Sequence, residues 1–392
     1  MTKIYDFDTP VSRRNTNCEK WDGCKKIFGT DNVIPVWIAD MDFKTPDFII
    51  DALKKRLEHE ILGYTFRPAS FYESLKKWVK RRSNWEINID DLTFSPGILP
   101  AINFAVDVFT EKNDKIIIST PVYHPFIRAV NDHCRTLVTS PLVNDNGYYA
   151  FDFEDFEKKA ASGVKMYIMC NPHNPVGRVW KREELERIAE ICIKYDVIVV
   201  SDEIHSDLIY RPNKHIHFAS LSKEAADRTI TFLTPNKTFN IAGLSASAVH
   251  APNKKLLAAF NKYMNDLHVN QGNIFGNIAF EAAYDFGDDW LEQLLKYLEG
   301  NINYVIDFID KNIPRLKAAK PEGTYLLWID CTGLKMDSSQ LTDFMINNAG
   351  LAFNQGVIFG EPGKNFVRMN IAAPRDLLKI VLTKLKNAVY IL

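Results

Sequence analysis

Residues 164–177 read Val-Lys-Met-Tyr-Ile-Met-Cys-Asn-Pro-His-Asn-Pro-Val-Gly. The first seven form a short apolar run that ends at a cluster of turn formers, which predicts a buried strand over 164–170. Four further runs are short, rich in Val, Ile, Phe and Met, and bounded by Pro, Gly, Asn or Asp. We expect strands there too, at 115–119, 197–201, 229–233 and 246–250.

Helix-length amphipathic stretches such as 181–195 lie between several of these runs. Earlier in the chain, Thr45 and Pro46 are expected to open a helix as its N-cap and first helical residue. A second helix is expected over 70–82. Strands that alternate with helices predict a mostly parallel sheet covered on both faces.

After Pro252 the pattern becomes mainly helical to about Pro314, and strands are then expected at 324–330 and 366–371. A chain of 392 residues exceeds the roughly 250–300 residues over which one core keeps growing. We therefore expect an α/β fold of two domains. Residues 46–285 form a large domain around the mostly parallel central sheet, and residues 1–45 and 286–392 form a smaller α+β domain, with the N-terminal arm packed on the later segment.

The net charge of −1 gives no global field that would attract nucleic acid or a membrane surface. The N-terminus lacks the apolar run of a signal peptide, and no segment reaches transmembrane length, so we expect a cytoplasmic protein. The cysteines are scattered, with no CxxC pair and no paired histidine spacing. We expect buried or half-buried thiols and no metal site from Cys18, Cys24, Cys134, Cys170, Cys192 and Cys331.

Polar residues that follow the predicted strands are candidate site residues, because open parallel sheets bind ligands beyond the carboxyl ends of their strands. Asn174 follows the run 164–170 in a turn held by two prolines and a glycine; an Asx-type turn is the alternative. Asp202 follows the run 197–201, where a buried carboxylate needs a cationic or donating partner such as a protonated pyridine nitrogen. A helix N-cap is the alternative interpretation of Asp202.

Lys237 stands in a turn after the run 229–233. A desolvated lysine has a lowered pKa and can form Schiff bases, whereas the alternative is an ordinary surface lysine. Gly97 leads into a helix that is expected to run to about Phe109, and the free N–H groups at its start can bind an anion. The alternative is a helix start without a ligand.

Arg368 is the one charged residue in the predicted strand 366–371. A planar carboxylate is its best partner, and a structural ion pair with an acidic neighbour is the competing explanation. Together these positions supply a Schiff-base lysine, a carboxylate for a pyridinium, an amide for a ring oxygen, a phosphate cradle and a carboxylate clamp. That set is what an enzyme dependent on pyridoxal 5′-phosphate (PLP) needs to hold its cofactor.

The sequence resembles the aspartate-aminotransferase-like (fold type I) PLP-dependent enzymes over essentially the whole chain. More narrowly, it resembles their cystathionine β-lyase/C–S lyase branch. The stretches that carry this resemblance are RRNTN (13–17), KWD (20–22), WIADMDF (37–43), GYT (63–65), PVYHPF (121–126), NPHNPVGRVW (171–180), DEIH (202–205), KTFNIAG (237–243) and NIAAP (370–374).

The resemblance implies a role for each matching residue. Lys237 would form the Schiff base with the cofactor and transfer protons, Asp202 would pair with the pyridine nitrogen, and Arg368 would bind the substrate α-carboxylate. Three further residues are expected at the cofactor ring: Tyr123 would stack on it as a further catalytic residue, Asn174 would bond the phenolic oxygen, and His205 would lie near the ring. Asn174 is also expected to contact the substrate. Gly97, the backbone of Ile98 and the hydroxyl of Thr234 are expected to hold the phosphate. Tyr64 would reach the phosphate of a neighbouring subunit, which implies a homodimer with shared active sites.

Three positions depart from the family pattern. Many relatives place an arginine eight residues beyond the lysine to hold the phosphate, and this chain has Ser245. A tyrosine is frequent three residues after the aspartate, and this chain has His205, which leaves the second contact to the ring oxygen open. Asn236 stands where serine is common before the lysine. Neutralisation of the phosphate would therefore depend on the helix start and on the partner chain.

The resemblance predicts β-elimination of a sulfur-containing L-amino acid to pyruvate, ammonia and a thiol, with the preferred substrate left open. Transamination by a class I/II aminotransferase is the alternative reaction. Motifs do not display the stereoelectronic control that separates the two, although no second arginine for a dicarboxylate substrate is obvious. A regulatory binding protein on the same scaffold is the alternative from another functional class.

Overall fold

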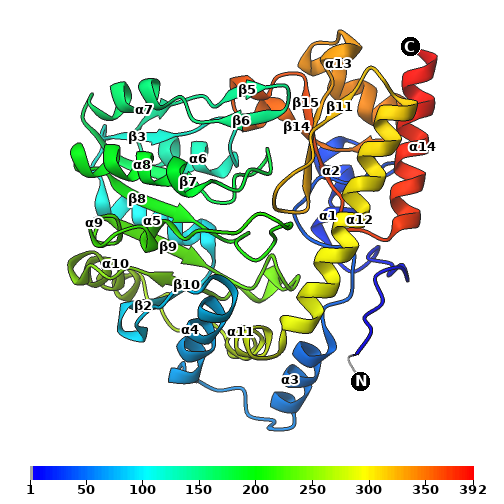
Figure 1. Ribbon diagram of the computed structural model, residues 1–392. Coiled ribbons are helices and arrows are strands. Elements are labelled where there is room, and N and C mark those ends of the chain that lie inside the picture. The colour runs from blue at the N-terminus through cyan, green and yellow to red at the C-terminus, as the bar shows by residue number, and fades with distance from the viewer. Residues whose placement is uncertain (1–2) are drawn as a thin grey trace.

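The computed structural model describes residues 3–392. The centre of its larger part is a seven-stranded sheet with strand order β2-β10-β9-β8-β7-β3-β4 (Figure 1). Neighbours from β9 to β4 are parallel, whereas β10 is antiparallel to both β9 and β2. The strands are β2 (Leu92–Ser95), β3 (Lys115–Ile118), β4 (Thr136–Thr139), β7 (Val164–Cys170), β8 (Ile198–Asp202), β9 (Thr229–Leu233) and β10 (Ser247–His250).

Alternation of side chains along these strands gives the sheet two apolar faces, each covered by helices. Ile116 and Ile168 pack with α5 (Ile98–Phe109), α6 (Pro125–Asp132) and α10 (Lys254–Asp266) on one face. Ile117 and Tyr167 pack with α7 (Phe153–Ala160) and α8 (Arg182–Lys194) on the other. The prediction of an α/β fold with a mostly parallel central sheet is therefore confirmed.

A second, four-stranded antiparallel sheet lies in the smaller part of the molecule, in the order β11-β12-β15-β14. Its strands are β11 (Lys317–Ala318), β12 (Leu326–Asp330), β14 (Asn354–Gln355) and β15 (Phe366–Asn370). The inner side chains of β12 and β15 pack on α12 (Asp288–Asn312) and α14 (Arg375–Ile391), which lie side by side in Figure 1.

The N-terminal segment returns to this smaller part. The amide of Tyr5 donates to Gln293 of α12 at 3.0 Å, and the hydroxyl of Tyr297 donates to Asp8 at 2.5 Å. A two-residue strand β1 (Ile34–Pro35) also pairs in parallel with β13 (Leu351–Ala352). The other elements of this segment are α1 (Glu19–Asp22) and α2 (Cys24–Phe28).

Two helices between the N-terminal segment and the central sheet show where the sequence prediction was accurate and where it was wrong. The predicted helix over 70–82 is α4 (Ala69–Ser83). The helix expected to start at Pro46 is α3 (Asp47–Leu57). Pro46 itself has φ −53° and ψ 139° and occupies the N-cap position, because its extended backbone precedes the first helical turn. Thr45 does not cap the helix, and its hydroxyl instead donates to the carbonyl of Asn240 at 3.5 Å.

The sequence patterns also missed β2 and β4. The second is a half-buried edge strand, Thr-Leu-Val-Thr, which lacks the apolar density of a central strand. The remaining α-helices and β-strands are β5 (Val143–Asp145), β6 (Tyr148–Ala150), α9 (Lys223–Ala226), α11 (Ile274–Phe286) and α13 (Ser338–Asp343). Across residues 3–392, no helix combines the length and apolar character that crossing a membrane requires.

Candidate active site

The carboxyl ends of β7, β8 and β9 bring the predicted site residues to one edge of the central sheet. Asp202 is the last residue of β8 and lies in register between Cys170 of β7 and Phe232 of β9. Asn174 follows β7 by four residues and Lys237 follows β9 by four residues. Parallel strands end on the same side of a sheet, so these three positions converge although they are far apart in the sequence.

Asp202 is a buried carboxyl group with few donors around it. Its Oδ1 accepts a hydrogen bond from the amide of Ile204 at 3.3 Å. Burial raises the pKa of Asp202 to about 7, while the charge of Lys237 acts in the opposite direction. Such a group can hold or release a proton near neutrality, and a cationic partner would keep it ionised.

Lys237 is held at the same edge by a backbone carbonyl. Its Nζ donates to the carbonyl oxygen of Ala39 at 2.7 Å. Burial lowers the pKa of Lys237 to about 8, and the charges of Asp40, Arg368 and Asp202 also act on it. A lysine amine in this range is available as a nucleophile and as a base.

Arg368 projects from β15 in the small sheet toward neutral acceptors. Its guanidinium donates to Asn174 Oδ1 at 3.0 Å, to Asn354 Oδ1 at 2.5 Å and to the carbonyl of Trp37 at 2.9 Å. Among residues 3–392 no carboxylate pairs with Arg368, which argues against a structural ion pair, and its buried Nε has no hydrogen-bond partner. A buried cation with only neutral partners is suited to bind the carboxylate of a small molecule.

Asn174 lies against Arg368, so the loop after β7 of the large sheet meets β15 of the small sheet. Its Oδ1 accepts the hydrogen bond from the guanidinium, and its backbone N–H donates to the sulfur of Cys170 at 3.4 Å. Asn174 can therefore orient the clamp as well as contact a ligand. Its predicted bond to a ring oxygen stays a prediction.

Tyr123 and His205 lie close enough to Arg368 for its charge to act on both. The half-buried Tyr123 stands just before α6, and burial raises the pKa of its phenol to about 12 while the charges of Arg368 and Asp202 act on it. His205 is buried, its ring lies 5.9 Å from that of Tyr325, and its Nδ1 has no partner within the described chain. Burial and the charges of Lys237 and Arg368 hold the pKa of His205 well below its usual value, so its imidazole is neutral.

The predicted phosphate cradle is the start of α5. Gly97 precedes the helix with φ 149°, a conformation that favours glycine, and it offers no side chain to cap the first N–H groups. Those groups, beginning with Ile98, can bind an anion. The hydroxyl of Thr234 donates to the carbonyl of Ala246 at 2.9 Å, so a phosphate contact would require its proton to turn away from that carbonyl.

Tyr64 does not join the other predicted residues in the same chain. It lies in the segment between α3 and α4 and is fully exposed. The apolar residues Ile61, Leu62 and Phe66 of the same segment are also exposed. Ser245, the residue that replaces the family arginine, is also exposed and has a left-handed backbone with φ 51°.

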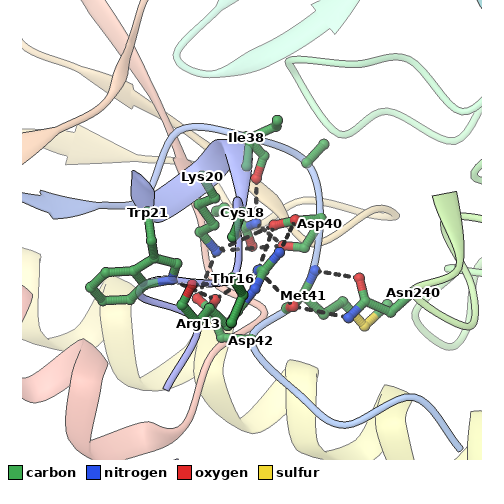
Figure 2. Close-up of polar contacts among 12 residues, drawn as sticks. Arg13, Thr16, Cys18, Lys20, Trp21, Ile38, Asp40, Met41, Asp42 and Asn240 are labelled. Carbon is green, nitrogen blue, oxygen red and sulfur yellow. Dashed lines mark hydrogen bonds and ion pairs between the residues drawn. The ribbon is translucent and has the colours of Figure 1, made fainter. Parts of the chain in front are cut away.

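The segment 37–42 is the part of the site that had no predicted role, although its sequence belongs to the family resemblance. Side chains from distant parts of the chain fix it, and Figure 2 shows one of them, Asn240, bound to Met41. Five successive carbonyls of the segment accept hydrogen bonds. The carbonyl of Trp37 accepts from Arg368, and those of Ile38 and Asp40 accept from Asn370. The carbonyl of Ala39 accepts from Lys237 and Tyr325, and that of Met41 accepts from Asn240 and Arg13. The segment therefore bridges the lysine of the large sheet and the arginine of the small sheet.

An ion-pair cluster supports this segment from the N-terminal side (Figure 2). Arg13 binds both carboxylate oxygens of Asp40, at 3.0 and 2.5 Å, and Asp42 at 3.0 Å. The fully buried Lys20 donates to Asp42 at 2.6 Å, and Trp21 Nε1 does so at 3.1 Å. Burial alone would raise the pKa of Asp42, but Lys20, Trp21 and Arg13 lower it, so the carboxylate stays ionised.

The site as a whole fits PLP. It holds an amine for the cofactor aldehyde, a buried carboxyl for the pyridine nitrogen, an uncapped helix start for the phosphate and a tyrosine beside them. Within residues 3–392, buried nitrogens of Arg368 and His205 lack partners, which is the state expected of a site that receives a polar ligand.

Comparison with known proteins agrees with this geometry. The sequence model described as "Aminotransferase class I and II" matches residues 32–385. Cystathionine beta-lyase PatB of Bacillus subtilis is 39% identical over 98% of this chain and 99% of its own. The structure of cystalysin from Treponema denticola, which contains PLP, is 40% identical with a TM-score of 0.96, covering 99% of both chains.

A third relative is the PLP-bound C–S lyase of Staphylococcus hominis. It is 37% identical with a TM-score of 0.92, over 99% of this chain and 98% of its own. The resemblance read from the sequence motifs is therefore confirmed over the full length. This chain belongs to the class I and II aminotransferase family of PLP-dependent, fold type I enzymes.

Proposed function

We propose that this protein is a PLP-dependent C–S lyase of the cystathionine β-lyase type. It would convert a sulfur-containing L-amino acid and one water molecule into pyruvate, ammonia and a thiol. The observation that carries the proposal is the convergence of Lys237, Asp202 and Arg368 on one edge of the central sheet. The names of the relatives, which include cystathionine β-lyases and C–S lyases, favour elimination over other reactions of the family.

We assign the cofactor contacts to the residues at the strand ends. Lys237 would hold the aldehyde carbon, Asp202 the pyridine nitrogen, and Tyr123 would stack on the ring. Asn174 and His205 would contact the ring oxygen, and the amides from Gly97 and Ile98, with Thr234, would hold the phosphate. When bound, PLP supplies an electron sink for the pair of electrons left at the substrate α-carbon.

Proton transfer falls to Lys237. Its amine, neutral above a pKa of about 8, would take the proton from the α-carbon and can later donate one to the departing sulfur. Asp202 would remain ionised opposite the ring nitrogen and so keep that nitrogen protonated. The carbonyl of Ala39 accepts from both Lys237 and Tyr325 and would hold the free amine during the reaction.

Arg368 would bind the α-carboxylate of the substrate. Its fork is already oriented by Asn174, Asn354 and the carbonyl of Trp37, so little side-chain freedom remains to be lost on binding. A carboxylate would also provide the anion that this buried guanidinium lacks.

Two structural features complete the proposal. A homodimer with shared active sites would place Tyr64, which is fully exposed in one chain, against the phosphate of its neighbour. The large domain would comprise residues 46–285 and the small domain residues 1–45 and 286–392. The first two residues of that small domain lie outside the described part of the chain.

Product analysis separates elimination from transamination. The holoenzyme is incubated with L-cystathionine, first without and then with an added keto acid, and pyruvate and thiol are measured. Elimination predicts pyruvate and thiol in equal amounts without keto acid. A strict requirement for keto acid would identify a transaminase instead, the alternative that the family name keeps open.

A further inference from the structure

A tight turn centred on Ala39 lies beside the amine of Lys237. The amide of Asp40 donates to the carbonyl of Ile38 at 3.0 Å, and this hydrogen bond between residues two apart closes a γ-turn. The carbonyl oxygen of the central residue lies outside the hydrogen-bonded ring and accepts from Lys237 Nζ at 2.7 Å. The orientation of this turn therefore sets where the lysine amine is held.

The buried side chain of Asn370, the last residue of β15, binds the turn on both sides of Ala39. Its Nδ2 donates to the carbonyl of Ile38 at 2.6 Å and to the carbonyl of Asp40 at 2.5 Å. Its Oδ1 accepts from the amide of Ala372 at 2.8 Å. A carbonyl only accepts and a backbone N–H only donates, so a single orientation of the amide group satisfies all three partners. Asn370 is therefore a fixed bridge between the two ends of the turn.

Tyr325, which directly precedes β12, binds the centre of the turn. Its hydroxyl donates to the carbonyl of Ala39 at 2.9 Å. Burial holds the pKa of this phenol well above its ordinary value, so the hydroxyl keeps its proton at neutral pH. A carbonyl oxygen has two lone pairs, and Tyr325 uses one and leaves the other for Lys237. The carbonyl thus stays anchored by Tyr325 whenever the lysine amine leaves it.

Asn370 and Tyr325 are held together by the small sheet. The strands β12 and β15 pair in antiparallel fashion, with Leu326 opposite Asn370. The amide of Ile371 donates to the carbonyl of Tyr325 at 3.0 Å, which extends the pairing by one further hydrogen bond. Such a ladder keeps the two side chains at a constant separation. Three successive carbonyls of the turn are therefore bound from one sheet, opposite the lysine of the other sheet.

We propose that Asn370 and Tyr325 are positioning residues for Lys237. Together they orient the turn so that the carbonyl of Ala39 offers the lysine amine one acceptor site in a defined place. Without either contact the turn can rotate, and the amine loses that place. A displacement of about 1 Å can cost about 100-fold in rate, because attack and proton transfer need aligned groups. The inference rests on the role proposed above for Lys237.

A purely structural role is the competing explanation, and two other buried residues are matched controls for it. The Nδ2 of Asn301 also donates to two carbonyls two residues apart, those of Ile371 and Ala373, at 3.0 and 2.9 Å. The hydroxyl of Tyr210 donates to the carbonyl of Thr324 at 2.7 Å. Removal of either control side chain breaks hydrogen bonds of the same kinds, but none that the turn receives.

Cofactor capture by the full-length apoprotein tests the proposal without the elimination reaction. PLP is added to each protein, and the rate at which the visible absorbance of the bound cofactor appears is measured. Asn370→Ala is compared with Asn301→Ala, and Tyr325→Phe with Tyr210→Phe. We expect capture to slow by about tenfold or more in the first variant of each pair, and by less than about twofold in its control. Urea unfolding should show losses of stability of similar size within each pair.

Steady-state kinetics of the holoenzyme with L-cystathionine give a second measurement. We expect kcat to fall by about tenfold in Asn370→Ala and Tyr325→Phe. The KM should stay within about twofold of wild type, because Arg368 keeps its hydrogen bonds to Asn174 and Asn354. A wild-type enzyme that forms no pyruvate would contradict the proposed lyase function alone, since the capture rates still test the positioning of Lys237.

Two results would overturn the proposal. The first is cofactor capture that is as fast in Asn370→Ala and Tyr325→Phe as in their controls. The second is equal slowing in all four variants, which would show that the loss of any buried hydrogen bond in this region has the same effect. If Asn370→Ala does not fold, the comparison of Tyr325→Phe with Tyr210→Phe decides by the same criteria.

Discussion

The amine of Lys237 donates to the carbonyl oxygen of Ala39 at 2.7 Å, across 198 residues of sequence. The same oxygen accepts from the hydroxyl of Tyr325 at 2.9 Å. A single backbone group thus positions the proposed catalytic lysine and connects it to the segment that also holds Arg368.

Replacement of Lys237 is expected to abolish the reaction without loss of the fold. Lys237→Ala should lower turnover by about 10³-fold or more, because the variant lacks both the group that anchors the cofactor and the base. Lys223→Ala, at an exposed lysine, should leave turnover unchanged. Pyruvate release and the visible cofactor absorbance are the measurements; a Lys237→Ala protein with near-normal turnover would refute the assignment.

The charge of Asp202 should make the stability of the apoprotein depend on pH. Burial raises its pKa to about 7, so the folded chain holds a proton that the unfolded chain loses above about pH 4. The protonated carboxyl therefore stabilises the folded chain fully below about pH 4, and this stabilisation is lost as the pH rises through about 7. Asp202→Asn does not titrate and escapes this loss.

Urea unfolding of the two apoproteins at pH 5 and pH 8 measures this difference. The free energy of unfolding of Asp202→Asn relative to wild type should increase by about 3 kcal/mol between the two pH values. If the free energy of unfolding of Asp202→Asn relative to wild type is the same at pH 5 and pH 8, burial does not raise the pKa of Asp202. With cofactor, Asp202→Asn should also lose activity by about 10²- to 10⁴-fold.

Arg368 is expected to control substrate binding through its planar fork. Arg368→Lys keeps the charge but not the paired donors, so kcat/KM should fall by about 100-fold, mainly through a higher KM. Arg315→Lys, at an arginine that donates to the carbonyls of Gly333 and Leu334, serves as the control. Steady-state kinetics measure the effect, and an unchanged KM would place the substrate carboxylate elsewhere.

Arg13 is expected to act on catalysis through the segment 37–42. Arg13→Ala removes the bidentate pair with Asp40 and loosens the carbonyl that holds Lys237, so kcat/KM should fall by about tenfold. The neighbouring Arg14 is exposed and its guanidinium lies over the ring of Trp21, so Arg14→Ala is the control. Equal kinetics for the two variants would exclude a positioning role for Arg13.

Sharing of active sites between two subunits can be tested with two inactive variants. Tyr64→Ala and Lys237→Ala are purified, mixed after mild dissociation and assayed. If Tyr64 serves the neighbouring subunit, each mixed dimer has one intact site, and random pairing should restore roughly a quarter of wild-type activity. No recovery in a mixture with proven exchange would contradict shared sites.

The pattern of apolar runs in the sequence determined five of the seven strands of the central sheet and the residues at its edge. The strands at 164–170 and 229–233 were predicted residue for residue, because buried parallel strands are continuous apolar runs bounded by turn formers. Their ends then located Asn174, Asp202 and Lys237. The start of α3 was misplaced because Pro46 fits both the N-cap and the first helical turn.

Only the tertiary structure decided what holds these residues. The acceptors of Lys237 and Arg368 include the carbonyls of Ala39 and Trp37, and every residue type carries the same carbonyl, so no sequence pattern reveals such a bond. The contact of Arg368 with Asn174 likewise depends on how the chain folds back on itself. Sequence specifies local backbone preference and burial, whereas distances between separated segments come from the packing of the two sheets.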